Sequence, residues 1–189
     1  MCHALVQNPK FFRLLLRIDQ ELAAEVRAAG CVCGGVLHCA DYPRKPRACP
    51  PELRADFALR LSLCCNRGHR QRTTPQSVRF LGQRVYLGLA VVLDSSRPAA
   101  QLAGAVRLST TLDIPLRTLQ RWRQWWRERF PLTALWQAAG ARFMPPPLIA
   151  QFPASLLERF AGNDEEALLR LLLFLRPITA RAPALNEGR

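Results

Sequence analysis

Cysteine and histidine side chains gather at two tight turns of the chain, with the spacing of ligands in a metal site. The first turn reads Cys31-Val-Cys33-Gly-Gly, and its glycines allow backbone amides to approach thiolates. The second, Cys64-Cys-Asn-Arg-Gly-His69, follows about thirty residues later. Zinc ribbons bring four N or S atoms together from two such turns. The sequence therefore predicts a structural zinc ion with the ligands Cys31, Cys33, one of Cys64 or Cys65, and His69.

The ligand set of this predicted zinc site is open in several respects. The first pair is separated by one residue, whereas ribbon ligands are usually two to four residues apart, and His69 stands where ribbons more often carry cysteine. His38 and Cys39 follow the first turn closely and could substitute for a ligand. The alternative is that the cysteines are buried thiols or that the site has decayed. No carboxylate has the H-x-x-E or H-E-x-x-H spacing, so catalytic zinc is not expected.

A second stretch, 108–122, has the apolar spacing of a helix-turn-helix. The positions that form the core between its two crossing helices are all apolar: Leu108, Leu112, Ile114, Leu119 and Trp122. Pro115 suits the first turn of the second helix, because backbone N–H groups there make no hydrogen bond within the helix and the missing N–H of proline costs nothing. Asp113 occupies the turn, where glycine is commonest.

The second of these helices, Leu116 to Arg129, would present a face suited to DNA. Its outward residues are Arg117, Gln120, Arg121 and Gln124. Arginine fits the major-groove edge of guanine and glutamine that of adenine, while Thr118, Arg123, Arg127 and Arg129 suit phosphates. The aromatic residues Trp122, Trp125, Trp126 and Phe130 recur at helical spacing and are expected in the core. The alternative is a helical hairpin with a solvated basic face.

The charge of the chain also favours a polyanionic partner. It has 27 Lys and Arg against 14 Asp and Glu, a net charge of +13. Residues 42–84 contain ten basic side chains and only two acidic ones. Those expected to contact DNA are Arg44, Lys45, Arg47, Arg70 and Arg72. Double-stranded DNA is therefore the expected partner.

The elements that must position these groups can be read from hydrophobic periodicity. A helix is predicted from Asn8, its N-cap, to Gly30, with an apolar stripe at Phe11, Leu15, Ile18, Leu22, Val26 and Ala29. Its solvated face would carry Arg13, Arg17, Asp19, Glu21 and Glu25. In 59–63, Leu alternates with Arg60 and Ser62, which predicts a half-buried strand with the leucines inward. The apolar run 85–93 fits a helix or a strand, and we favour a helix.

The remaining chain reads as helices at 99–112, 155–160 and 165–175. The predicted fold is mainly α with a small β zinc-ribbon-like module and a helix-turn-helix in the second half. Its regions are a helix at 1–30, the basic module at 31–83, the helix-turn-helix domain at 84–144 and a helical region at 145–189. The leucine-rich C-terminal helices are expected in the core, and the apolar residues at 171–175 also suggest a homodimer.

Several functions are excluded at this level. No run of 18 uncharged apolar residues occurs, so no membrane segment is expected. The first residues lack a small-residue cleavage site, and the seven cysteines are unevenly placed, which favours a reducing cytoplasm over a disulfide framework. No P-loop, GxGxxG or GxSxG is found, so the chain is not expected to be an enzyme.

Together these modules resemble the short zinc-ribbon plus helix-turn-helix proteins found with insertion sequences, and the DNA-binding regions of transposases. The resemblance covers residues 31 to about 130 and rests on the turns at 31–35 and 65–69, the stretches 40–47 and 70–75, and 112–122. It implies recognition of terminal inverted repeats or regulation of the element's promoter, with a transposase or recombinase as a further partner. The alternatives are an adaptor for a recombinase, an RNA-binding protein and an undetected nuclease.

Overall fold

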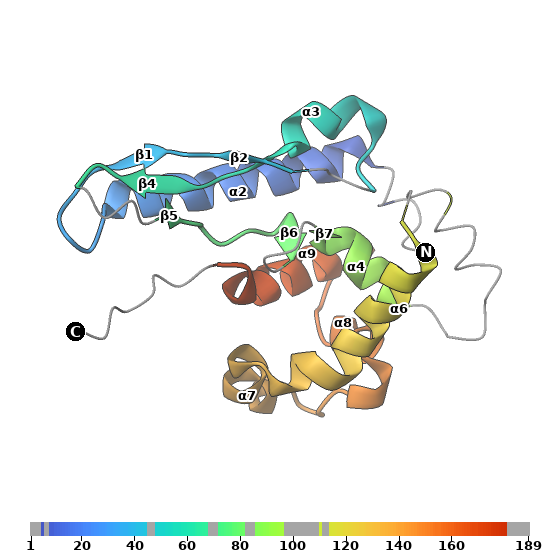
Figure 1. Cartoon of the computed structure of the whole chain (residues 1–189). Helices are drawn as coiled ribbons and strands as arrows, with labels where there is room; N and C mark the ends of the chain where they lie inside the picture. Colours follow the sequence, from blue (N-terminus) through green and yellow to red (C-terminus); the bar gives the residue numbers. More distant parts are fainter. Residues whose placement is uncertain are drawn as a thin grey trace.

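A computed structural model shows a mainly helical protein with a small β module, as the sequence predicts (Figure 1). The residues that it describes are 5, 8–44, 48–67, 72–81, 86–96, 110 and 114–180. Helix α2 runs alongside the strands β1 to β4, and the later helices lie below them together with β6 and β7 (Figure 1). None of the described helices has the length and apolar content needed to cross a membrane.

Helix α2 (Pro9–Ala29) begins and ends where the sequence predicts. The side chain of Asn8 accepts hydrogen bonds from the backbone N–H groups of Lys10 and Phe11, which caps the first turn. Gly30 ends the helix at φ 75°, a left-handed conformation that glycine adopts without strain. The apolar stripe is buried at Phe11, Leu15 and Leu22.

The β module consists of short antiparallel strands. Strands β1 (Leu37–Cys39), β4 (Leu63–Cys65) and β5 (Arg72–Thr73) form one sheet in the order β1-β4-β5. The other two pairs are β2 (Tyr42–Pro43) with β3 (Leu59–Arg60) and β6 (Phe80–Leu81) with β7 (Tyr86–Leu87). Between β2 and β3 lie a 3-10 turn, η1 (Pro51–Leu53), and helix α3 (Arg54–Phe57). In the register of β1 and β4, Leu37 lies opposite Cys65.

Two predicted orientations in this half of the chain are wrong. Leu59 is 45% exposed whereas Arg60 is only 3% exposed, so the expected leucine-inward alternation does not hold there. Asp19, expected on the solvated face of α2, is 1% exposed. The reason in both cases is a buried polar network, because satisfied hydrogen bonds and an ion pair allow charged groups to leave water.

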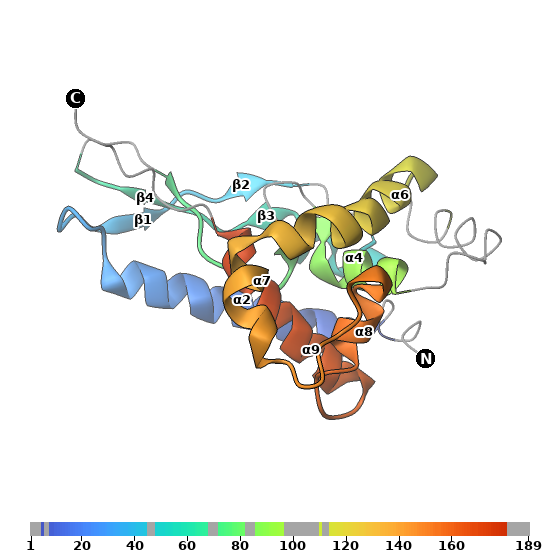
Figure 2. The same cartoon turned by 90° about the horizontal axis from the view of Figure 1, so that it is seen from below.

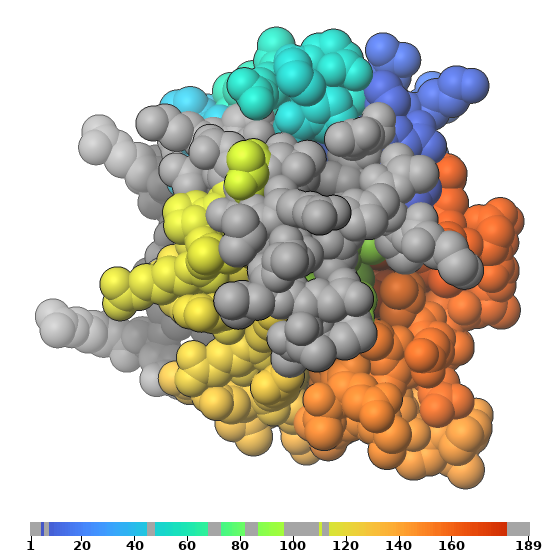
Figure 3. All heavy atoms as spheres, turned by 90° about the vertical axis from the view of Figure 1, so that its right-hand side faces the viewer, coloured from blue at the N-terminus to red at the C-terminus, as the bar shows by residue number. Residues whose placement is uncertain are grey.

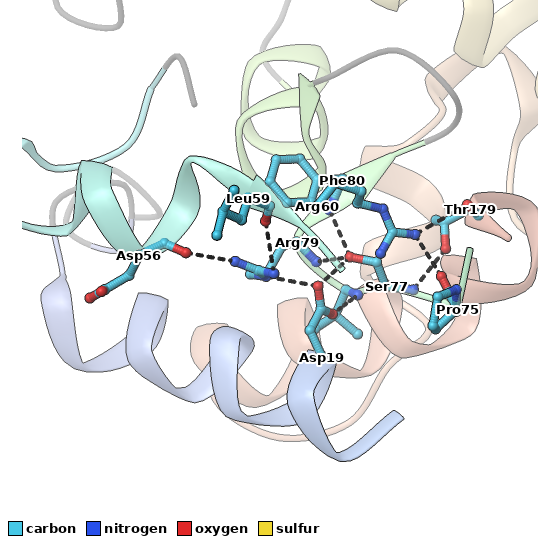
Figure 4. A network of polar contacts seen from close by, with 10 residues as sticks. Asp19, Asp56, Leu59, Arg60, Pro75, Ser77, Arg79, Phe80 and Thr179 are labelled. Atoms are coloured by element: carbon cyan, nitrogen blue, oxygen red, sulfur yellow. Dashed lines mark hydrogen bonds and ion pairs between the residues drawn. The ribbon is translucent and has the colours of Figure 1, made fainter. Parts of the chain in front are cut away.

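Asp19 is the centre of that network (Figure 4). Its Oδ2 accepts from Arg79 Nε at 2.8 Å and from Ser77 Oγ at 2.5 Å, and its Oδ1 accepts from the backbone N–H of Val78 at 2.7 Å. The N–H of Ser77 donates to Thr179 Oγ1 at 2.8 Å. One carboxylate thus ties α2 to the segment before β6 and, through Ser77, to the C-terminal 3-10 turn.

Arg60 belongs to the same buried region. Its Nη2 donates to the carbonyl oxygens of Pro75 at 2.6 Å and Thr179 at 3.4 Å. Burial lowers the pKa of its guanidinium, and the nearby charge of Asp19 opposes that effect. These bonds fix β3 to the segment before β6 and to the C-terminal 3-10 turn.

The helical part begins with α4 (Gly88–Ser95), which is buried throughout and confirms a helix for most of the apolar run. Helix α6 (Leu116–Gln124) continues into a π-helical turn, η2 (Trp125–Arg129). The elements after it are η3 (Phe130–Leu132), α7 (Ala134–Ala139), η4 (Gly140–Arg142), η5 (Ile149–Gln151), α8 (Ala154–Leu157), α9 (Asp164–Leu175) and η6 (Arg176–Thr179). A capping box between Asn163 and Glu166 starts α9.

The buried apolar residues that the structure describes form two hydrophobic clusters, and α2 contributes to both. The main core gathers residues from 5 to 175, including Trp122, Trp126 and Phe130 as predicted. A second, small cluster contains Leu37, Leu63 and Cys65, with Val26 of α2 packed against it. Leu171, Leu172 and Leu175 are buried within the chain, which accounts for most of the apolar surface that suggested a homodimer.

Candidate metal centre and nucleic-acid interface

Three cysteines meet where the two predicted turns come together. The Sγ atoms of Cys31, Cys33 and Cys65 all lie within 4.8 Å of one another, and those of Cys33 and Cys65 are 3.5 Å apart. Sulfur ligands on a tetrahedral zinc ion, at about 2.3 Å from the metal, would be about 3.8 Å apart. The three thiols therefore could hold a metal ion.

The local sequence explains how the first turn reaches the second. The turn closes through hydrogen bonds from Cys31 N–H to Gly35 O (3.0 Å) and from Gly34 N–H to Cys31 O (2.8 Å), with Gly34 at φ 75°. A Cβ atom on Gly35 would lie only 2.5 Å from the sulfur of Cys65. A glycine is required there because any side chain would displace that thiol.

Arg67 completes the surroundings of the thiols. Its backbone N–H donates to Cys65 Sγ at 3.4 Å, and its Nη1 donates to the carbonyl of Cys33 at 3.0 Å. The N–H of Arg67 lowers the pKa of Cys65, but burial and the thiols of Cys33 and Cys31 outweigh it, so this pKa is raised. A bound metal would act in the opposite direction, because coordination deprotonates a thiol.

The other predicted ligands are placed differently. Cys64 precedes Cys65 on β4, and successive side chains of a strand point to opposite faces. Cys64 is accordingly outside the thiol cluster, and its Sγ lies 3.8 Å from the carbonyl of Cys65. His38 is exposed, and Cys39 Sγ accepts from Arg27 Nη1 at 3.8 Å. His69 lies outside the described residues.

Cys49 provides a first test of the packing, because it is buried away from this cluster. Burial raises the pKa of the Cys49 thiol to about 12, although the charge of Arg54 opposes it. At pH 8 its thiolate, the reactive form, should be about three orders of magnitude scarcer than for a free cysteine. We expect iodoacetamide to label exposed Cys39 long before Cys49, as measured by peptide mapping of the native protein. Equal labelling rates would contradict the buried position.

The predicted DNA-reading face of α6 lies on the surface. Its four members are all exposed: Arg117, Gln120, Arg121 and Gln124. Arg117 and Gln124 each lie three and four residues from the adjacent pair Gln120 and Arg121, which places the set on one side of the helix. The opposite side is buried through Leu119 and Trp122. Figure 3, which views the right-hand side of Figure 1, shows the α6 region in yellow at the surface of the molecule.

Two residues expected to contact phosphate are directed inward. Thr118 is 5% exposed, and its Oγ1 accepts from Arg121 Nη2 at 3.2 Å. Arg123 is mostly covered, and its Nη2 lies 3.7 Å from the carboxylate of Asp94. Helix α6 packs on α4, where Asp94 is fully buried beside Arg123, so Arg123 is mostly covered. The phosphate contacts of Thr118 and Arg123 stay predictions. Arg127 and Arg129 remain exposed.

The other predicted basic residues are only partly described. Arg44 is half-buried, with its guanidinium 4.4 Å from the centre of the Tyr42 ring. Lys45, Arg47 and Arg70 lie outside the described residues, as does the side chain of Arg72. The first helix of the predicted helix-turn-helix also falls outside, apart from Thr110. The sequence prediction missed Arg67, although its position two residues after Cys65 is a usable signal.

Comparison of the chain with models of protein families, with curated proteins and with solved structures found no match.

Proposed function

We propose that this protein binds double-stranded DNA through the exposed face of α6 and has no enzymatic activity. The observation that carries the proposal is the set of four exposed side chains on that face, Arg117, Gln120, Arg121 and Gln124. Within the described residues, neither arginine of the set forms an ion pair. Gln124 donates to Glu128 at 2.9 Å, an exposed contact that DNA could replace.

The chemistry of this face suits the major groove. Arginine can donate two hydrogen bonds to O6 and N7 of guanine, and glutamine can pair with N6 and N7 of adenine. A buried opposite side, formed by Leu119 and Trp122, fixes the helix on the main core, so these side chains are presented by a rigid element. The exposed Arg127 and Arg129 in the π-helical turn would then contact phosphates.

We further propose that the three-cysteine cluster holds a structural zinc ion. Thiolates are ligands that zinc prefers, and Cys31, Cys33 and Cys65 supply three of the four that a structural site needs. The fourth ligand that we propose is His69, which follows Cys65 by four residues in the sequence. A closed set of four protein ligands leaves no position for substrate, which agrees with a stabilising role.

The DNA proposal is tested by salt-dependent binding. We expect the double variant Arg117→Ala, Arg121→Ala to weaken binding to a random-sequence duplex by roughly 10- to 60-fold at 0.1 M salt, and to lower the log–log salt slope by about two. The physical reason is that each arginine releases about one counterion from the phosphates. Fluorescence anisotropy over a salt series measures both quantities in zinc-loaded protein.

A matched control is Arg159→Ala, since Arg159 is exposed but lies outside the α6 face. It should leave affinity and slope nearly unchanged. If the wild-type protein fails to bind duplex at low salt, the proposal is wrong and a protein adaptor becomes the better hypothesis. If single-stranded RNA displaces the duplex at lower concentration, RNA is the partner. Selection of bound sequences would then test for inverted repeats of a mobile element.

A further inference from the structure

We propose that the cysteine cluster and α6 make two separate contacts with a single duplex, held about one turn of DNA apart by α2. This inference rests on the proposed function and adds to it the extent of the binding site and a second contact residue, Arg67. The second contact is the tip of the β module, which we define as residues 31–36 together with Arg27 and Arg67.

Helix α2 links the two contacts as a rigid spacer. Phe11, Phe12 and Leu15 in its first half belong to the main core, which also contains Leu119 and Trp122 of α6. Near its other end, Val26 packs on the small cluster that includes Cys65. A helix of 21 residues is about 31 Å long at 1.5 Å per residue. The cluster is therefore held well away from α6.

That separation fits the repeat of B-DNA. The same groove returns to the same face of a duplex after about 34–36 Å. Strands β1 and β4 lie at one end of the molecule and α6 at the other in both Figure 1 and Figure 2. In the view of Figure 2, these strands and α6 lie along one edge, whereas α2 and α9 lie along the other. A duplex along the first edge could meet both ends of the protein.

The tip has the chemistry of a phosphate contact. Arg67 is exposed while its Nη1 bonds to Cys33 O at 3.0 Å, so the cysteine turn orients its guanidinium. Arg27 is exposed beside Cys39, and within the described residues neither arginine forms an ion pair. Val32 is 96% and Val36 57% exposed, which gives the tip apolar side chains beside its charges. Cations around a small apolar tip suit the phosphates and sugars at the edge of a groove.

The decisive experiment varies the length of the duplex. Zinc-loaded full-length protein is titrated against random-sequence duplexes of about 8 and about 20 base pairs, since about 10 base pairs separate successive turns of a groove. Only the longer duplex can reach both contacts. We expect Arg67→Gln to weaken binding to the long duplex by about eightfold at 0.1 M salt, with a salt slope lower by about one, and to leave the short duplex unaffected. Arg27→Gln should behave similarly, and it lies outside the cysteine turns.

Controls separate this inference from the proposed function. Arg159→Gln removes the same charge elsewhere and should change neither duplex. The double variant Arg117→Gln, Arg121→Gln should weaken binding to both lengths, because α6 is engaged in either case. If Arg67→Gln and Arg27→Gln match Arg159→Gln, or weaken both lengths equally, the two-contact inference is wrong while the proposed function stands. If no duplex binds, the proposed function itself fails. Metal content of Arg67→Gln must equal that of the wild type, so that a lost cluster is not mistaken for a lost contact.

Discussion

Replacing Asp19 by alanine is expected to lower the free energy of unfolding by about 3–5 kcal/mol, because the guanidinium of Arg79 would remain buried without its counter-charge. Both side chains are fully covered, and their Nε and Oδ2 atoms are 2.8 Å apart. The carboxylate also accepts from Ser77 Oγ and from the N–H of Val78. Its removal would therefore leave two further buried donors unsatisfied, which adds to the loss.

Urea denaturation followed by tryptophan fluorescence measures this effect, since the tryptophans lie in or against the main core. The matched control is Glu21→Ala, two residues later on the same helix, whose exposed side chain should contribute less than about 0.5 kcal/mol. Equal losses for Asp19→Ala and Glu21→Ala would show that the ion pair is not buried.

A double-mutant cycle identifies the cause of the loss. If the unpaired charge of Arg79 is responsible, adding Arg79→Met to Asp19→Ala should cost much less than the sum of the two single losses. We expect a coupling free energy of about 2–3 kcal/mol. Additive losses would instead attribute the effect to the bonds with Ser77 and Val78.

For the ion pair of Asp19 and Arg79, the sequence could have predicted that Asp19 is buried, but not which residue it pairs with. Asp19 follows Leu15 by four residues and precedes Leu22 by three, which places it on the apolar face of α2. That spacing could have predicted a buried carboxylate. Its partner could not be predicted, because Arg79 is sixty residues away and reaches Asp19 only once α2 and the segment before β6 are packed.

In the candidate sites, too, local features could be predicted from the sequence, whereas those that depend on the packing of distant segments could not. The turn residues and their spacing predicted that the two cysteine turns would meet. The choice between Cys64 and Cys65 depends on the orientation of strand β4, because adjacent residues of a strand face opposite sides. On α6, the apolar positions Leu119 and Trp122 predicted the buried face. The covered position of Arg123 depends on Asp94 of α4, a tertiary contact that helical periodicity does not contain.

Cys65→Ser is expected to weaken metal binding by at least about a hundredfold, because it removes one of the three thiolates that would hold the ion. The chain offers a close control in the preceding residue. Cys64 lies outside the cluster, so Cys64→Ser should bind metal like the wild type. Competition with a chelator measures the affinity, and absorption from thiolate to cobalt counts the sulfur ligands in cobalt-substituted protein.

Metal removal should destabilise the small hydrophobic cluster and leave the main core intact. Among the described residues, the small cluster buries Leu37, Leu63 and Cys65 alone, too little apolar surface to fold unaided, whereas the main core is extensive. We expect chelation to raise hydrogen exchange at 31–39 and 63–67 while tryptophan fluorescence stays native. If Cys64→Ser and Cys65→Ser weaken metal binding equally, the cluster is assigned to the wrong cysteine. If neither variant changes it and chelation leaves exchange unaltered, the three cysteines are buried thiols and the β module is stable without a metal.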